Sequence, residues 1–348
     1  MYMDPPTKRV LALWVSLLLG CSSGPSARGA PESAGSARPV NAEVVVWQSP
    51  LEREHPLAGK IWDVERERFV ERSALIAQIR SAQLVLLGEQ HDNADHHQLQ
   101  AWLLQGLIDH GRRPALVLEM LNVEQQPSVD QALAARAGAD AFARAVDWEH
   151  SGWPAFALYR PLFERALHAE LALVAAGIDR KVAMGIARGG TGALDPALVE
   201  RFALNDALSP EVAEHARKEM ADAHCGLLPA SMLDTMVLVQ RARDARLAER
   251  MHASGANGGA VLIAGAGHVR NDRGVPAELA RAYGAASLAL GLLEVETGVH
   301  APAAYAAHFD APRLPFAFVW FTPRASDTDH CAELRASMQH GASPGENR

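Results

Sequence analysis

Short apolar runs alternate with longer amphipathic stretches along most of this chain, and this alternation constrains the fold more than any other feature. A continuous apolar run indicates a strand that is buried on both faces, as in a parallel sheet covered by helices. Runs predicted to be strands lie at residues 84–87, 116–118, 171–174, 261–264, 287–293 and 316–320. Stretches predicted to be helices lie at residues 72–81, 94–109, 156–168, 211–224 and 230–252. We therefore predict an α/β fold with a mainly parallel sheet flanked by helices.

Two further stretches, residues 122–151 and 195–228, have helical patterns and contain no predicted strand. A chain of 348 residues is long enough for one large domain, so we expect this material to form a small helical sub-domain within it. The glycine-rich residues 188–192 lack the Gly-Lys-Ser/Thr of a phosphate-binding loop, and we expect only a turn there.

The N-terminal residues have the features of a lipoprotein signal peptide. The apolar residues 10–19 follow Lys8 and Arg9 and are too few to span a bilayer as a helix. Residues 18–21 (LLGC) match a lipobox, in which the thiol of Cys21 receives a diacylglycerol, and Ser22 is typical of lipoproteins sorted to an outer membrane. We predict a signal peptide at 1–20 and a lipid-anchored protein of the cell envelope, and we expect the anchor to lie in the outer membrane. Ordinary secretory cleavage is the alternative.

The segments that follow differ in composition. Residues 21–42 are rich in Ser, Gly, Ala and Pro and should form a flexible tether. Residues 43–324 should form the folded domain, and residues 325–348 a polar C-terminal tail. Lipidation of Cys21 would leave Cys225 and Cys331, which can form a disulfide in an oxidising compartment. A metal site or a nucleophile at these thiols is disfavoured because no CxxC spacing occurs.

The net charge of -8 argues against a nucleic-acid partner, because neutralising phosphates requires a concentrated basic face. The first 50 residues contain no other long apolar stretch, and we expect no second membrane-spanning segment further along. The chemistry of the protein should therefore lie in the folded domain.

Polar side chains follow three of the predicted strands. Glu89 and His91 come after the first strand, Glu119 after the second, and His268 after the strand at 261–264. Because the carboxyl ends of parallel strands meet at one edge of a sheet, we expect these four side chains to share a site. Any one of them could simply mark the return of the chain to solvent, but four ionisable groups at three strand ends favour a site.

Other polar residues occupy positions that should face inward. His96 shares a helical face with apolar residues and should lie beside the site, whereas the neighbouring His97 should project elsewhere. Gln240 and Asp244 occupy apolar positions of the helix predicted at 230–252. Buried polar groups need partners, so both should hydrogen-bond to Arg270 or to a histidine, unless they mark a wet edge of the helix.

Together these motifs resemble those of the ChaN-like haem-binding lipoproteins, whose superfamily also contains the Tiki proteases and the erythromycin esterases. The resemblance extends from about residue 47 to residue 323. The matching motifs are LLGEQHDNADHHQLQ from Leu86, LEM from Leu118, SGWP from Ser151 with Tyr159, HCG from His224, Gln240 with Arg243 and Asp244, and GAGHVRNDRGVP from Gly265.

The resemblance implies an envelope protein that binds haem and takes part in iron acquisition. In this family haem is bound as a face-to-face pair between two subunits with a tyrosine ligand, which implies a haem-bridged homodimer and makes Tyr159 the candidate ligand here. Arg180, Arg188 and Arg270 are candidate partners of the haem propionates. No CxxCH occurs, so the implied haem b would be held non-covalently. An outer-membrane haem receptor is the implied transport partner.

The superfamily also implies a different class of function. The spacing of Gly88 and His91 resembles the GxxH of the Tiki proteases, so Glu89, His91, Glu119 and His268 could hold a divalent metal ion that activates water. The same residues could instead carry out metal-free acid/base hydrolysis, as in the esterase relatives. Haem binding is the favoured hypothesis, because the whole motif set and the lipobox match the ChaN-like proteins more closely than either enzyme group, and hydrolysis is the alternative.

Overall fold

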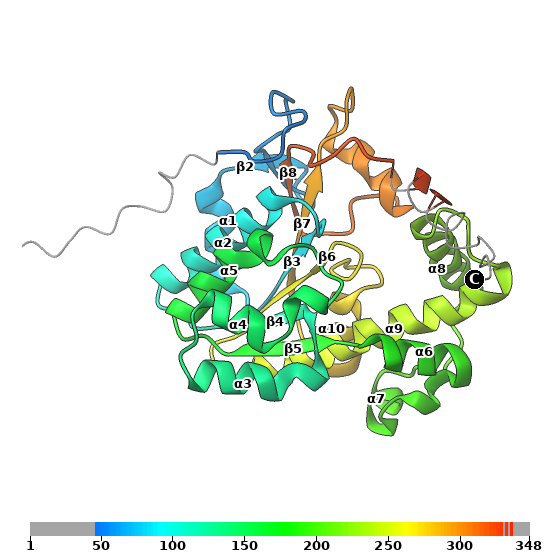
Figure 1. Ribbon diagram of the computed structural model, residues 1–348. Coiled ribbons are helices and arrows are strands. Elements are labelled where there is room, and N and C mark those ends of the chain that lie inside the picture. The colour runs from blue at the N-terminus through cyan, green and yellow to red at the C-terminus, as the bar shows by residue number, and fades with distance from the viewer. Residues whose placement is uncertain (1–45, 330, 333–334, 337–348) are drawn as a thin grey trace, which may run out of the picture. The chain divides into compact units, whose positions relative to one another are not determined.

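A mixed β-sheet forms the centre of the fold in the computed structural model, which describes residues 46–329, 331–332 and 335–336 (Figure 1). Within these residues eight strands are ordered β2-β1-β8-β7-β3-β6-β4-β5. The strands are β1 (Ile61–Asp63), β2 (Arg68–Val70), β3 (Leu84–Glu89), β4 (Ala115–Asn122), β5 (Leu173–Gly177), β6 (Ala260–Gly265), β7 (Leu288–Glu294) and β8 (Phe318–Thr322). Strands β3 to β8 pair in parallel, whereas β1 pairs antiparallel with β2 and β8. The predicted mainly parallel sheet is confirmed.

Helices cover the sheet on both faces (Figure 1). Helices α1 and α5 pack against α2 on one side, and α10 packs against α9 on the other, where α9 contacts β4, β5 and β6. The helices are α1 (Arg72–Ser81), α2 (Ala94–Asp109), α3 (Gln126–Ala134), α4 (Ala139–Ala145), α5 (Phe156–His168), α6 (Arg180–Gly189), α7 (Pro196–Arg201), α8 (Pro210–Ala223), α9 (Ala230–Ser254) and α10 (Val275–Tyr283). The core therefore lies in two apolar layers, one on each side of the sheet.

The small helical sub-domain stays a prediction: the stretch 122–151 contains α3 and α4, which pack against each other, and the stretch 195–228 contains α7 and α8. Helices α6, α7 and α8 each pack against α9. Helix α9 thus connects α6, α7 and α8 to strands β4, β5 and β6 of the sheet. The glycine-rich residues 188–192 differ from the turn that was expected, since they contain the end of α6 and the 3₁₀ segment Gly190–Ala193.

The predicted strands and helices agree with the structure where burial is complete. Strands β3 and β6 are buried along their whole lengths, and helices α1, α2 and α5 begin and end at the predicted residues. Elements β1, β2, α6 and α10 were not predicted from the sequence. Strands β1 and β2 have three residues each, and β2 is mostly exposed, so neither forms a continuous apolar run.

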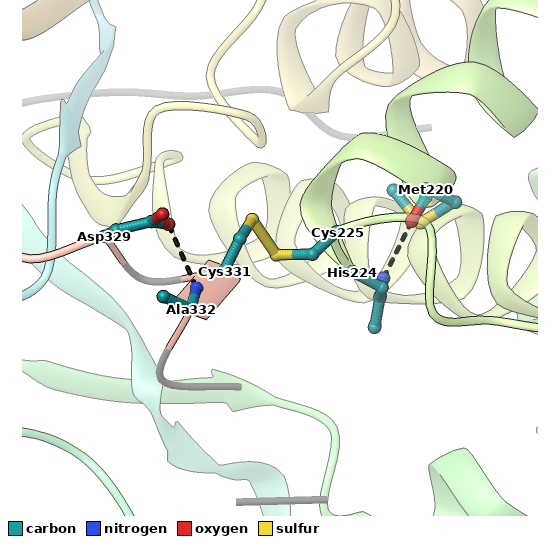
Figure 2. Close-up of a disulfide and its surroundings, with 6 residues drawn as sticks. All are labelled: Met220, His224, Cys225, Asp329, Cys331 and Ala332. Atoms are coloured by element: carbon teal, nitrogen blue, oxygen red, sulfur yellow. Dashed lines mark hydrogen bonds between the residues drawn. A yellow bond between two sulfur atoms is a disulfide. The ribbon is translucent and has the colours of Figure 1, made fainter. Parts of the chain in front are cut away.

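A disulfide joins Cys225, in the turn after α8, to Cys331 near the C-terminus (Figure 2). The two Cα atoms are 5.4 Å apart, and the bond closes a segment of 106 residues. The pairing that the sequence suggested is present in the structure. It attaches the C-terminal segment to the helical layer around α8.

The predicted signal peptide at 1–20, the lipidation site Cys21 and the tether at 21–42 lie outside the described residues. Among the helices that the structure does describe, none is both long enough and apolar enough to span a membrane.

We expect Cys331→Ser to lower the free energy of unfolding by about 2–4 kcal/mol, because a disulfide across a long segment restricts the unfolded chain. Urea denaturation of the oxidised protein, the variant and the reduced protein measures this effect. The variant and the reduced protein should unfold at the same lower urea concentration. Equal midpoints for all three would show that the bond contributes nothing to stability.

Candidate functional site

Glu89, at the end of β3, is a buried carboxylate surrounded by hydrogen-bond donors. Its Oε1 accepts from Nδ1 of His91 and from the hydroxyl of Tyr159, both at 2.9 Å. Its Oε2 accepts from Nε2 of Gln100 at 2.7 Å and lies 3.2 Å from Nδ1 of His97. Burial disfavours the charged form, but His97 and the hydrogen bond from His91 outweigh it and hold the pKa of Glu89 below its usual range.

His97 provides the positive charge next to Glu89. Its Nε2 donates to the carbonyl of His91 at 3.0 Å, and its Nδ1 faces the carboxylate of Glu89 and the side-chain oxygen of Gln100. Both ring nitrogens therefore face acceptors, a setting that favours the imidazolium. The pKa of His97 is raised despite burial because Glu89 stabilises the charge.

His91 is held by the same carboxylate but reaches the surface. Because the ionised Glu89 can only accept, Nδ1 of His91 carries the proton, and its Nε2 has no hydrogen-bond partner among the described residues. The ring meets that of Trp153 edge to face, with centroids 4.7 Å apart, and the side chain is 38% exposed. Burial lowers the pKa of His91, but Glu89 and Glu119 raise it overall.

Glu119, His268 and Asp244 form a second chain of hydrogen bonds. Nε2 of His268 lies 3.2 Å from Oε1 of Glu119, and its Nδ1 lies 2.6 Å from Oδ1 of Asp244. The backbone N–H of Gly265 donates to Oε2 of Glu119 at 2.8 Å. Gln240 lies beside the same ring, with its side-chain nitrogen 3.2 Å from Nδ1 of His268.

The charges of this second chain follow from its geometry. Burial lowers the pKa of His268, but Glu119 and Asp244 outweigh it and raise the pKa to about 10. Burial raises the pKa of Glu119, yet His268 brings it down to about 2. Burial dominates at Asp244 and raises its pKa to about 6. At neutral pH His268 is therefore an imidazolium shared by two carboxylates.

Two glycines let the strand ends approach one another. A Cβ on Gly88 would lie 2.3 Å from Cγ2 of Val269, so only glycine allows β3 to pass the loop after β6. A Cβ on Gly265 would lie 3.1 Å from Nε2 of His91 and 3.8 Å from Oε2 of Glu119. The structure thus brings Glu89, His91, Glu119 and His268 to one edge of the sheet, as the strand pattern indicated.

His96 and Tyr159 point into the core instead. Nδ1 of His96 accepts from the backbone N–H of Gln90, and its Nε2–H donates to Oγ1 of Thr322 at 2.8 Å. Burial lowers the pKa of His96 to about 3, so the ring is neutral and fixes the loop after β3. His97 was expected to project elsewhere, but it contacts Glu89. The apolar face of α2 that contains Leu99 includes His96 and not His97, so the helical pattern did not indicate this contact.

The placement of Tyr159 does not suit the haem ligand that the family resemblance implied. The residue is fully buried, its ring lies against His97, and its hydroxyl donates to Glu89. Burial and the charge of Glu89 raise the pKa of Tyr159, which disfavours the phenolate that would bind ferric iron. The hydroxyl of Tyr305 is also hydrogen-bonded, to Glu296 and Val299 of the backbone.

The three arginines predicted to meet propionates have different surroundings. Arg180 lines the cleft described below, whereas Arg188 is exposed in the last turn of α6 and does not. Arg270 is buried and bound to Asp272 and Glu219, so it lacks free donors for a propionate. Gln240 and Asp244 were predicted to bond to Arg270 or to a histidine, and the structure shows the histidine, since both contact His268.

An open cleft of about 790 Å³ lies beside the strand-end cluster, between the ends of β4 and β5, the turn at 151–154, α6 and α9. Its apolar walls include Trp153, Ile178, Met184, Met232, Met236 and Leu247. Its polar residues include His91, Glu119, Arg180 and Arg243. Among the residues that the structure describes, no hydrogen bond or ion pair engages the guanidinium of Arg180 or of Arg243, so both are available to an anionic ligand.

The cluster does not have the geometry of a resident metal centre. Across the described residues, no group of three or more His, Cys, Asp or Glu side chains is arranged to hold a metal ion. Each carboxylate here is bonded to a histidine instead. The metal-binding alternative for Glu89, His91, Glu119 and His268 therefore has no support from the side-chain arrangement.

Residues 75–279 match the family described as haem-binding uptake, Tiki superfamily, ChaN. The chain belongs to this family. The matched segment runs from α1 into α10 and so includes all four residues of the strand-end cluster. Haem is the ligand that membership of this family supports.

One solved structure supports the fold assignment. The ChaN structure from Campylobacter jejuni, described with cofacial haem binding, superposes with a TM-score of 0.59 at 19% identity, covering 75% of this chain and 95% of that chain. An erythromycin esterase, EreC, gives a TM-score of 0.43 at 13% identity over 82% of this chain and 100% of that chain. This value is too low to support a shared activity. No curated protein is significantly similar to this chain in sequence.

We expect the free energy of unfolding to fall as the pH rises from 7 to 10. The pKa of His268 is about 10 in the folded protein against 6.5 in the unfolded chain, so its contribution is complete below pH 6.5 and is lost toward pH 10. The loss is about 2–4 kcal/mol, at 1.36 kcal/mol for each pH unit traversed. Asp244 does not oppose it, because its pKa of about 6 lies below this window.

Urea denaturation at pH 7 and pH 10 tests this prediction, with His268→Gln as the control. The variant should lose much less stability between the two pH values than the parent protein. Equal losses in the two proteins would mean that His268 is not charged in the folded state.

Proposed function

We propose that this protein binds haem b non-covalently in the cleft beside the strand-end cluster, with His91 as the iron ligand. The observation that carries the proposal is the hydrogen bond from Nδ1 of His91 to Glu89, which leaves Nε2 free at the wall of the cleft. A metal-ligating histidine commonly donates its other ring N–H to a carboxylate, which fixes the ring and increases its basicity. Imidazole is an established ligand of haem iron.

The cleft also suits the rest of a porphyrin. Its volume of about 790 Å³ lies in the range of small-molecule sites, and its walls are largely apolar. Trp153 is positioned by its contact with His91 and can pack against a planar ring. The thioethers of Met184, Met232 and Met236 offer a deformable apolar surface opposite.

Arg180 and Arg243 are the propionate partners in this proposal. Both guanidinium groups line the cleft, and each can bind a carboxylate through two parallel hydrogen bonds. Arg243 was part of a quoted sequence motif but was not among the predicted partners. Arg188 and Arg270 are not included, because the first lies outside the cleft and the second is bound to Asp272 and Glu219.

We further propose that the protein is an outer-membrane lipoprotein anchored through Cys21 and that it takes part in haem or iron uptake. Support for the anchor comes from the lipobox alone, and support for uptake comes from the family to which the chain belongs. A haem-bridged homodimer is part of the proposal because the Campylobacter jejuni ChaN structure is described with cofacial haem. An outer-membrane haem receptor is the proposed transport partner.

Acid/base hydrolysis is the second candidate function. It is favoured by one observation, the pairing of His91 with Glu89, since a carboxylate that orients an accessible imidazole is the arrangement of a general base. His268 is less suited to that role because its pKa of about 10 keeps it protonated at neutral pH. Hydrolysis of a p-nitrophenyl ester that is abolished in His91→Ala, without any haem binding, would favour this candidate.

We expect ferric haem to bind lipid-free protein saturably and to shift its Soret band. His91→Ala should weaken binding by at least about 100-fold, because the iron loses its protein ligand. Arg180→Gln and Arg243→Gln should each weaken it by about 10-fold, since each removes a charge-assisted bond to a propionate. Spectrophotometric titration measures all three.

Two matched variants serve as controls for this titration. Arg188→Gln removes a charge from the same helix as Arg180 but outside the cleft, so haem affinity should not change. Tyr159→Phe should retain the parent Soret spectrum, because the phenol is bonded to Glu89 and not to iron. Loss of the spectrum in Tyr159→Phe with normal binding in His91→Ala would overturn the proposed ligand.

The anchor is tested separately in cells. Cys21→Ser removes the only thiol of the lipobox, so the protein should move from the membrane fraction to the soluble fraction, and labelling with radioactive palmitate should be lost. Cys331→Ser is the matched control and should stay in the membrane fraction. Unchanged fractionation and labelling of Cys21→Ser would contradict lipidation at this residue.

A further inference from the structure

A second cavity, of about 350 Å³, lies next to the cleft on a neighbouring face of α9. The cleft is lined by Met232, Met236 and Arg243 of α9, and the cavity by Val237, Gln240, Arg241 and Asp244. At 100° per residue these two sets occupy adjacent stripes of the helix. The other walls of the cavity come from α8, α10, the segment at 202–208 and the loop after β6.

Part of the cavity lining is apolar. It consists of Phe202, Leu208 and Val237 with Val212 and Met220 of α8, and Val212 is 41% exposed. An exposed valine beside buried aromatic and aliphatic side chains leaves an apolar surface that a ligand can cover. A ligand of this cavity should therefore have an apolar body.

The arginines of the cavity are already bound to protein acceptors. Arg241 donates to the carbonyls at 203, 204 and 206, Arg273 is paired with Glu219, and Arg281 is paired with Glu278. None of these three side chains offers a guanidinium free of a partner. An anionic ligand would have to displace one of these contacts.

The charge that remains at the cavity is negative. Five carboxylates and three guanidinium groups line it: Asp206, Glu219, Asp244, Asp272 and Glu278 with Arg241, Arg273 and Arg281. Asp244 shares the imidazolium of His268 with Glu119. Nδ1 of His268 is hydrogen-bonded to Oδ1 of Asp244. Within the described residues, no hydrogen bond engages Oδ2 of Asp244. A buried carboxylate with an unused oxygen is a favourable partner for a cationic group.

We propose that this cavity binds a small amphiphilic amine, with the protonated amino group at Asp244 and the apolar body against Phe202, Val212 and Val237. The site is distinct from the haem cleft, because the two cavities share no lining residue. The volume of about 350 Å³ restricts the ligand to a small molecule. This inference does not depend on haem binding.

Isothermal titration calorimetry with 2-phenylethylammonium as the probe tests this proposal on the lipid-free protein. The amine should bind saturably, the isosteric neutral n-propylbenzene should bind at least about tenfold more weakly, and 3-phenylpropionate should not bind. Asp244→Asn should weaken amine binding by about tenfold or more, since it removes the charge but keeps the shape. Equal affinity for the amine and the neutral probe, or no saturable binding, would overturn the proposal.

A second variant keeps the charge of Asp244 and fills the cavity with a larger side chain. Ala216 of α8 lines the cavity and is remote from the strand-end cluster, so Ala216→Phe should abolish amine binding while haem titration stays unchanged. Ala187→Phe, in the haem cleft, is the matched control and should leave amine binding intact. Amine binding that survives Ala216→Phe would place the amine elsewhere and contradict the assignment. Failure of haem binding alone would affect only the proposed function.

Discussion

The buried carboxylate of Glu89 is the interaction on which the rest of the site depends. An unpaired charge in this position would be costly, and four side chains from three elements supply the donors that it needs. These contacts with Glu89 hold Gln100 and His97 of α2 and Tyr159 of α5 against the end of β3. The same carboxylate orients His91 so that one ring nitrogen is bonded and the other faces the cleft.

Much of the fold could be predicted because burial leaves a clear pattern in the sequence. The apolar run before Gly88 indicates a strand that is covered on both faces. Helix α2 begins at Ala94, after the N-cap Asn93, whose side chain accepts from two backbone N–H groups. Strands β1 and β2 could not be found in this way, since three-residue antiparallel strands carry no periodicity. Strand β1 pairs with β8, far away in the sequence, where Ile61 lies opposite Trp320, and β2 pairs with β1 alone.

The site was partly predictable for a related reason. Parallel strands bring Glu89, Glu119 and His268 to one edge whatever the strand order, so strand ends were sufficient to group them. Which of these side chains hydrogen-bond to one another depends on the direction in which each side chain points, and the sequence does not reveal that direction. His97 follows His96 by one residue and differs from it only in the direction that it takes from α2, and Tyr159 was assigned to iron although its hydroxyl is bonded to Glu89.

The central claim is that Glu89 presents His91 to haem iron. Electron paramagnetic resonance of the ferric haem complex, prepared with ¹⁵N-labelled histidine, tests this ligation most directly through the coupling between iron and nitrogen. The account predicts a coupling to one histidine nitrogen that is absent from His91→Ala. A spectrum of tyrosinate-ligated iron, unchanged in His91→Ala, would contradict it.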